Sequence, residues 1–208
     1  MNIEYEIKSE ITDLYAGKIV EGLEGKSKKQ IDKYFDFKNN QLFIKGVFIR
    51  DRNGVDFEIK YNPNYLDSTH TVCNEYKYSK NLDEKEINEI ISFLSQFSPD
   101  LGNIHLSSCS IYDLFKEVGL INYVTISKDR ISYETNSKGV EISLDKVDNL
   151  GEFIELESIS NLGKDEIIAI QDKFNLLNLP IGYVELYLRK HNKELYLKGR
   201  YLLDNDRK

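Results

Sequence analysis

The first segment of the chain alternates charged and apolar residues, and this alternation constrains the fold more than any other feature. It reads Glu4-Tyr5-Glu6-Ile7-Lys8. Successive side chains of a β-strand point to opposite faces, so the segment predicts a strand with one charged and one apolar face. The pattern returns along the chain with charges of both signs, at Arg50/Arg52, Glu58/Lys60, Glu75/Lys77, Lys128/Arg130, Glu141/Asp145 and Glu155/Glu157. We therefore expect a sheet whose strands share one strongly charged face.

The length and composition indicate one folded domain, which we expect to span residues 1–208. Domains commonly contain ~100–200 residues. The 40% of hydrophobic residues is enough for a substantial core, and the 14 Tyr and 10 Phe favour strands. With three Pro and no tract rich in Pro, Gly or Ser, the sequence shows no linker.

The charge and cysteine content exclude several kinds of partner. The formal net charge is −7, whereas non-specific nucleic-acid binding needs a basic surface, so we expect no nucleic-acid partner. No stretch approaches the ~20 apolar residues of a membrane span, and the first residues lack an apolar signal segment. Cys73 and Cys109 alone make neither a disulfide framework nor a zinc site. A cytoplasmic protein with no membrane partner is the expectation.

Apolar periodicity and turn residues predict an α+β protein of antiparallel strands with helices set between groups of strands. Strands are expected over residues 3–11, 30–36, 42–52, 55–61, 72–78, 123–127, 129–135, 140–147, 153–159, 184–188 and 194–198. Helices are expected over residues 13–22, 83–97, 110–118 and 163–177, and a lysine-rich loop over residues 22–29. Asn53-Gly54 predicts a hairpin turn. About eight strands could close into a barrel, which would remove exposed edges.

Charged faces that point into a closed barrel would meet in one lumen. Arginine and lysine there would neutralise a polyphosphate. Carboxylates, which phosphate repels, would instead hold Mg²⁺ or Mn²⁺ that bridge to phosphate oxygens. For any single strand, a solvated face with surface ion pairs explains the same residues, as at Glu58/Lys60 and Glu75/Lys77. The order of the motifs along the chain bears on this choice.

The charged motifs follow one another in a defined order. They read Glu4-Tyr5-Glu6-Ile7-Lys8, Gln30-Ile31-Asp32-Lys33-Tyr34-Phe35-Asp36, Arg50-Asp51-Arg52, Phe57-Glu58-Ile59-Lys60, Lys128-Asp129-Arg130, Ser143-Leu144-Asp145, Gly151-Glu152-Phe153-Ile154-Glu155-Leu156-Glu157 and Gly182-Tyr183-Val184-Glu185-Leu186-Tyr187. This ordered set, over residues 3–188, resembles the CYTH family, the triphosphate tunnel metalloenzymes. The set is more specific than any one of its motifs.

The resemblance implies an eight-stranded antiparallel β-barrel, the triphosphate tunnel, flanked by helices. It implies a triphosphate bound by the cations Lys8, Arg50, Arg52, Lys60, Lys128 and Arg130. It also implies a divalent metal, Mg²⁺ or Mn²⁺, held by the carboxylates Glu4, Glu6, Glu75, Asp145, Glu155 and Glu157. Glu4 and Glu6 are the candidate catalytic residues, because a carboxylate there would orient or deprotonate an attacking water.

One strand departs from the family pattern. Family members commonly have R-x-E-x-E there, whereas this chain has Cys73-Asn74-Glu75-Tyr76-Lys77. An arginine is lost and a glutamate is replaced by Lys77. We add Lys77 to the predicted triphosphate-binding residues, because it restores a positive charge from a shifted position. The change is equally compatible with an altered substrate.

Three functions fit these residues. The first is a metal-dependent hydrolase of inorganic, nucleoside or thiamine triphosphate, in which water attacks the terminal phosphorus. The second is a class IV adenylate cyclase, in which the ribose 3′-hydroxyl attacks the α-phosphorus and pyrophosphate leaves. The third, suggested by Cys73 and Lys77, is a module that binds a phosphorylated ligand without turnover. Hydrolysis is favoured because it needs no pocket to position a ribose. In each case the partner is a small-molecule triphosphate, bound by a monomer or homodimer as in the family.

Overall fold

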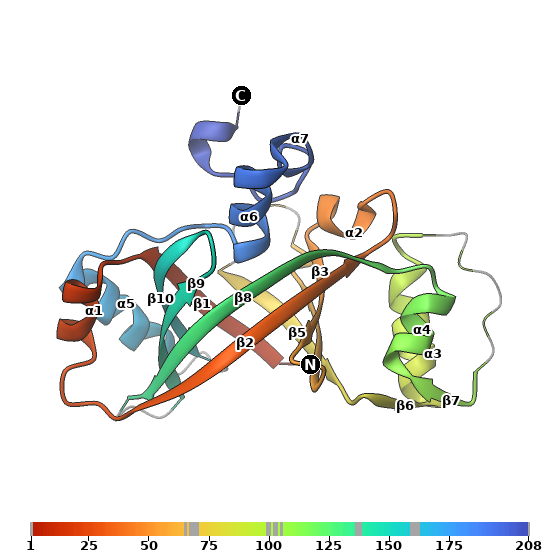
Figure 1. Ribbon diagram of the computed structural model, residues 1–208, viewed down its shortest axis with the longest axis horizontal. Helices are drawn as coiled ribbons and strands as arrows, with labels where there is room; N and C mark the ends of the chain where they lie inside the picture. Colours follow the sequence, from red (N-terminus) through yellow and green to blue (C-terminus); the bar gives the residue numbers. More distant parts are fainter. Residues whose placement is uncertain are drawn as a thin grey trace.

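In the computed structural model, the strands with alternating residues close into a β-barrel (Figure 1). The structure describes residues 2–64, 66, 71–98, 101, 104, 106–135, 139–158 and 163–207. Hydrogen-bonded neighbours in the barrel follow the order β1-β10-β9-β8-β2-β3-β4-β5, and every pair is antiparallel. The strands are β1 (Asn2–Glu10), β2 (Gly25–Asp36), β3 (Val47–Arg52), β4 (Asp56–Tyr61), β5 (Val72–Tyr78), β8 (Ile121–Glu134), β9 (Val140–Val147) and β10 (Gly151–Ser158). The predicted fold class, an eight-stranded antiparallel barrel with flanking helices, is confirmed.

The strand register gathers the charged residues on the inner face. On β1, Glu6 and Lys8 lie opposite Glu157 and Glu155 of β10. On β8, Arg130 lies opposite Asp145 of β9. Side chains alternate along a strand, so the intervening residues point outward. On β1 and β10 they include Ile7, Ile154 and Leu156, which pack in an apolar core, whereas the outward Asp129 of β8 is exposed. The charged faces of the strands thus share one lumen, as the alternation predicted.

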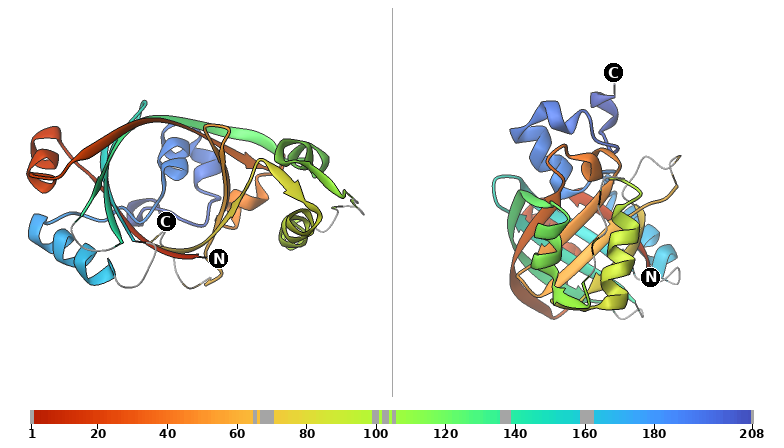
Figure 2. Two further views of the ribbon diagram at one scale, coloured as in Figure 1. Left: turned by 90° about the horizontal axis from the view of Figure 1, so that it is seen from below. Right: turned by 90° about the vertical axis from the view of Figure 1, so that its right-hand side faces the viewer.

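Helices cover the barrel on three sides (Figures 1 and 2). On one side α1 (Asp13–Ile19) and α5 (Lys164–Phe174) lie beside β1, β9 and β10, where Ile142, Leu156 and Ile167 form a core. On the opposite side α3 (Glu84–Leu94) and α4 (Ile111–Glu117) bury Ile87 and Leu114, next to the short sheet of β6 (Asn81–Asp83) and β7 (Ser108–Ser110). At one end of the barrel lie α2 (Gln41–Ile44), α6 (Tyr183–His191), α7 (Lys193–Tyr196) and the short 3₁₀ helix Asp204–Asp206.

The local signals for turns and helix starts are confirmed. Asn53 and Gly54, with φ of 59° and 70°, turn the chain between β3 and β4, and glycine adopts such a φ without strain. Asp83 caps α3: its side chain accepts a hydrogen bond from Glu86 N, and Glu86 in turn accepts from the backbone N–H of Asp83. All four predicted helices are present, each shorter than expected at one or both ends.

The two predicted strands near the C-terminus are wrong, because both segments are helical. Val184, Leu186 and Leu188 alternate as in a strand, but Val184 and Leu188 are also four apart, and in α6 both are buried on one helical face. In α7 the side chain of Asn192 accepts a hydrogen bond from Leu195 N and so caps the turn. Short apolar runs of this kind do not separate the two structures by periodicity alone.

Three other boundaries differ from expectation. The lysine-rich stretch predicted as a loop is the first part of β2, where Lys28 pairs with Arg130 of β8. Residues 121–134 form one continuous strand rather than two. The expected strand over residues 42–52 begins with α2, because Asp36 Oδ1 and Oδ2 accept hydrogen bonds from Leu42 N at 3.0 Å and Phe43 N at 2.8 Å and so stabilise a helical turn.

Two further features are the positions of the histidines and the character of the helices. His191 ends α6 and is exposed, while His70 and His105 lie outside the described residues. Among the helices of the described residues, none has both the length and the apolar character that crossing a bilayer requires.

Candidate active site

The barrel lumen holds a cavity of about 110 Å³ that brings the predicted cations together. Its walls include Lys8, Arg50, Arg52, Lys60, Lys77, Lys128 and Arg130, which are all the predicted triphosphate-binding residues. Five of the lining side chains are carboxylates of strands, two of which lie on β10. The walls also carry the aromatic rings of Tyr34, Phe48 and Tyr183. Side chains from seven strands and α6 therefore converge on one polar cavity.

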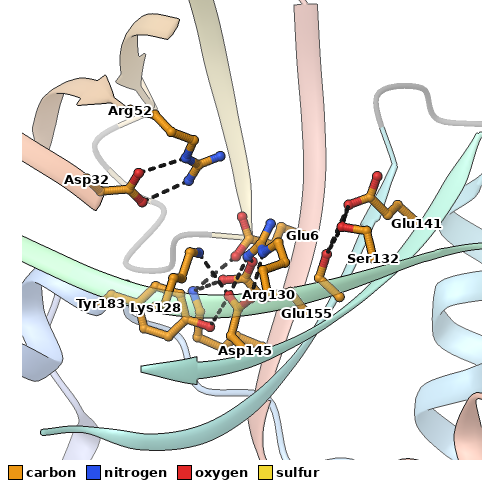
Figure 3. A network of polar contacts seen from close by, with 12 residues as sticks. Glu6, Asp32, Arg52, Lys128, Arg130, Ser132, Glu141, Asp145, Glu155 and Tyr183 are labelled. Atoms are coloured by element: carbon orange, nitrogen blue, oxygen red, sulfur yellow. Dashed lines mark hydrogen bonds and ion pairs between the residues drawn. The ribbon is translucent and has the colours of Figure 1, made fainter. Parts of the chain in front are cut away.

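The centre of the site is an ion-pair cluster around Arg130 (Figure 3). Arg130 Nε lies 2.6 Å from Asp145 Oδ1, and its Nη2 contacts Glu155. Lys128 Nζ lies 2.9 Å from Asp145 Oδ2, and Lys8 Nζ lies 3.0 Å from Glu155 Oε1. All of these side chains are at most 7% exposed. Buried charges of this kind persist only when they are paired, which explains why each cation has a carboxylate beside it.

Arg52 and Arg50 form a second group on β3. Arg52 donates to Asp32 through Nε at 2.7 Å and Nη2 at 2.9 Å, a bidentate arrangement, and Arg50 contacts Glu58. Burial would raise the pKa of Asp32, but the hydrogen bond from Arg52 and the charge of Arg50 outweigh it and hold the pKa well below its usual value. Burial would also raise the pKa of Glu58, but the charges of Arg50 and Lys60 outweigh this effect and lower the pKa to about 2. These carboxylates stay ionised and hold the guanidinium groups in place.

Lys60 and Lys77 extend the cationic lining toward the barrel opening. Lys60 Nζ lies 2.6 Å from Glu4 Oε2 and 3.5 Å from Glu75 Oε1. Lys77 Nζ lies 3.1 Å from Glu75 Oε2, and its side chain is 56% exposed, far more than any other lining cation. The lysine that departs from the family pattern thus faces the same cavity, at its rim. Cys73 lies four residues before Lys77 on β5, with Sγ 3.8 Å from Glu4 Oε2.

Glu4, Glu6 and Glu157 form an acidic region of the lumen. Burial and the neighbouring charge of Glu4, with a contribution from Glu6, raise the pKa of Glu157 to about 8. Glu4 is 2% exposed, and its Oε1 has no hydrogen-bond partner among the described residues. Mutual repulsion and an unpartnered carboxylate oxygen both fit a divalent cation. Within the described part of the chain, no three His, Cys, Asp or Glu side chains are already arranged around a common metal position, so side chains would have to turn toward one another.

The other predicted metal ligands lie elsewhere in the lumen. Asp145 is engaged on both oxygens, by Lys128, Arg130 and the hydroxyl of Tyr183 at 2.9 Å. Glu155 lies between Lys8 and Arg130, and Glu75 between Lys60 and Lys77. Their roles as metal ligands stay predictions.

Several residues of the site had no predicted role, among them Asp32, Glu58, Tyr183 and Glu185. Asp32 and Glu58 share the inward phase of their strands with the predicted residues, so the alternation could have identified them. Glu185 could not have been placed, because residues 184–188 were expected to form a strand, and Tyr183 directly precedes them. Tyr183 lies with its ring centroid 4.3 Å from Lys8 Nζ and 4.7 Å from Lys128 Nζ, a cation–π geometry that places both amino groups.

A family model, the CYTH domain, matches residues 2–181, nearly the whole chain. The chain belongs to the CYTH domain family. Solved structures agree with this fold. A protein of Pyrococcus horikoshii has a TM-score of 0.60 at 20% identity, covering 88% of this chain and 98% of that chain. A putative adenylate cyclase of Vibrio parahaemolyticus has a TM-score of 0.56 at 15% identity, covering 89% and 98%. The CYTH model ends just before α6, which nevertheless lines the cavity.

A further similar structure is described as a putative adenylyl cyclase from Hippeastrum with a dominant triphosphatase activity. Its TM-score is 0.56 at 14% identity, and the match covers 98% of both chains. At this identity the likeness concerns the fold. No match to a curated protein was found.

Proposed function

We propose that this CYTH protein is a divalent-metal-dependent hydrolase of a triphosphate bound in the barrel lumen. The observation that carries the proposal is the convergence of seven cations from five strands on one cavity. A triphosphate carries about four negative charges near neutral pH, and arginine and lysine side chains fixed in a cavity stabilise such charge better than water does. CYTH proteins include triphosphatases and adenylate cyclases, and the triphosphatase activity described for the Hippeastrum protein supports hydrolysis.

The lumen is not a simple basic pocket, and this supports a metal requirement. Each of the seven cations has a carboxylate neighbour, so the cations alone do not leave an excess positive charge to match a triphosphate. Glu4, Glu6 and Glu157 are the residues that would hold Mg²⁺ or Mn²⁺, because they repel one another and Glu4 keeps a free oxygen. A bound divalent ion would supply the missing positive charge and polarise a phosphate oxygen.

The residues of this chain would divide the remaining work. Lys8, Lys128 and Arg130 lie together and would bind one part of the triphosphate, while Arg50 and Arg52 on β3 would bind another. Asp32 and Asp145 orient the arginines, so little reorganisation is needed during phosphoryl transfer. Glu4 or Glu6 would accept the proton of the attacking water. The proposal treats residues 1–208 as one domain, because α6 completes the cavity of the barrel.

Product analysis tests this proposal. The purified chain is incubated with Mg²⁺ or Mn²⁺ and, separately, with inorganic tripolyphosphate, ATP and thiamine triphosphate. We expect release of orthophosphate that EDTA abolishes. Cyclic AMP and pyrophosphate from ATP would instead identify a cyclase. Thermal stabilisation by the ligands with no product would identify a binding module and contradict the proposal.

A further inference from the structure

The inner face of the barrel changes character beyond Arg130. The next inward residues on β8 and β9 are neutral hydroxyls and one acid, namely Ser132, Ser143 and Glu141. Ser132 Oγ and Ser143 Oγ both donate to Glu141 Oε1, at 2.8 Å and 2.9 Å, and the two hydroxyl oxygens lie 3.3 Å apart. We call these three residues the hydroxyl site. None of its three residues is a cation, and the neighbouring Lys26 of β2, which lies opposite Ser132, is paired with Glu134 at 3.4 Å.

The register places the hydroxyl site directly along the lumen from the predicted phosphate site. Ser132 follows Arg130 by two residues, which is roughly 7 Å along a strand. Ser143 lies opposite Ser132, and opposite Glu155 on its other side. In Figure 3, Ser132 and Glu141 lie on the far side of Arg130 from Arg52. A molecule bound to Arg52 and Arg130 would therefore reach the hydroxyl site if it extended further in the same direction.

Open space adjoins the hydroxyl site. A cavity of about 210 Å³ is lined by Lys26, Ser27 and Lys28 of β2, Ser132 and Glu134 of β8, and Glu141 of β9. All of these except Ser27 share the inward phase of their strands, so the cavity lies on the inner face at the barrel end. Gln30, two residues along β2 from Lys28, is 2% exposed, and its Oε1 has no hydrogen-bond partner within the described ranges. The register places Gln30 opposite Lys128, so this unpartnered amide is a hydrogen-bonding group on the phosphate side of the lumen.

The chemistry of the hydroxyl site selects against phosphate and for hydroxyl groups. Glu141 would repel a phosphate oxygen, whereas its Oε2, to which none of the described residues donates, can accept hydrogen bonds from a neutral donor. The serine hydroxyls use their hydrogens on Glu141 and retain lone pairs as acceptors. A carboxylate beside acceptor hydroxyls is suited to a pair of neighbouring hydroxyl groups, as when an acidic residue binds a ribose in nucleotide sites.

We propose that the hydroxyl site binds the non-phosphate part of the substrate, a hydroxyl-bearing group esterified to the triphosphate. This inference rests on the proposed function and narrows it: the substrate class is an organic triphosphate such as a nucleoside triphosphate, in preference to inorganic triphosphate. The hydroxyl site contributes affinity for the organic group alone. Arg130 and the other lumenal cations bind the phosphates of both kinds of substrate.

The test compares two substrates on the same proteins. Glu141→Gln and the double variant Ser132→Ala/Ser143→Ala are assayed with ATP and with inorganic tripolyphosphate, and affinities for both are measured in parallel by calorimetry. We expect the KM and the dissociation constant for ATP to rise about tenfold, as for the loss of one or two hydrogen bonds to a charged group, with tripolyphosphate values unchanged within about twofold. Matched controls on the outer face are Ser127→Ala on β8 and Glu152→Gln on β10.

A substrate variant makes the assignment specific. The wild-type protein should bind 2′,3′-dideoxy-ATP about tenfold more weakly than ATP, and Glu141→Gln should bind the two equally, because the two changes remove the same contact. Equal losses for ATP and tripolyphosphate in Glu141→Gln would place Glu141 in the phosphate or metal machinery and overturn the proposal, as would unchanged ATP binding in both variants. If neither substrate is hydrolysed, the proposed function fails, and the ratio of the two affinities still decides the hydroxyl site.

Discussion

The amino group of Lys8, on β1, lies 4.3 Å from the ring centroid of Tyr183, on α6. This contact joins the first strand of the barrel to a helix that follows the part matched by the family model. The same ring faces Lys128, and its hydroxyl donates to Asp145. Tyr183 therefore supports two lysines of the predicted phosphate site, and Asp145 beside them, from one position.

Removing the ring should affect both stability and binding. Tyr183 is 6% exposed, so Tyr183→Ala should lower the free energy of unfolding by about 3 kcal/mol, whereas Tyr183→Phe loses one hydrogen bond and should cost about 1 kcal/mol. Urea denaturation measures both values. We also expect weaker tripolyphosphate binding in Tyr183→Ala than in Tyr183→Phe, because only the former leaves Lys8 and Lys128 unsupported. Equal binding in the two variants would show that the ring does not position the lysines.

The paired substitution Glu4→Gln/Glu6→Gln should abolish metal-dependent hydrolysis while the barrel still forms. Both carboxylates are lost from the acidic region, and with them the proposed metal ligands and the acceptor for the proton of water. Activity assays in Mg²⁺ and Mn²⁺, with circular dichroism as the folding check, measure the effect. Glu152→Gln, on the outer face of β10, is the matched control. Full metal-dependent activity in the paired variant would remove Glu4 and Glu6 from the mechanism.

Triphosphate affinity should fall at alkaline pH through Lys128. Burial and the adjacent charge of Arg130 lower the pKa of Lys128 to about 8. Above this pH the free amino group is neutral, so binding of an anion that prefers the charged form must take up a proton, and affinity should fall by up to about tenfold per pH unit. Calorimetry with tripolyphosphate from pH 6.5 to 9.5 measures the profile. In Lys128→Arg the side chain stays charged, so the fall in affinity above about pH 8 should disappear. If the fall persists in this variant, another group causes it.

Acid should destabilise the fold in part through Glu58. Its pKa in the folded protein is lowered to about 2, from a usual value near 4.5. A carboxyl group whose pKa is lower in the folded than in the unfolded protein stabilises the fold at any pH above the unfolded value. This stabilisation is lost as the pH falls from about 4.5 toward 2. The loss between pH 6 and pH 3 is about 2 kcal/mol. Urea unfolding of Glu58→Gln at both pH values should show a correspondingly shallower loss than the wild-type protein. The exposed Glu24→Gln variant should keep the wild-type slope.

The alternation of charged and apolar residues was sufficient to predict the inner face of the barrel. Arg50, Arg52, Lys128 and Arg130 face the cavity because the charged residues of their strands recur with the two-residue period that places side chains on one face. The closed barrel and the cavity followed from the same pattern and from the order of the motifs.

The partners of each cation could not be predicted, because they depend on register and side-chain torsions. Asp32 meets Arg52 only because β2 and β3 pair with these two residues opposite each other. The segment that forms α6 was predicted to be a strand, since Val184 and Leu188 fit a strand and a helix equally well. Packing against the barrel end decides between the helix and the strand, and a short stretch of sequence carries no information about that packing.

The pairing of lumenal cations with carboxylates turns ligand binding into an exchange of partners. A phosphate oxygen that approaches Arg130 competes with Asp145 and Glu155 for the same donors. One exchange gains little, because one anion replaces another. Three linked phosphoryl groups make several exchanges at once while losing translational freedom only once, so the lumen should favour long phosphate chains over orthophosphate by multiplicity of contact rather than by the strength of any one contact.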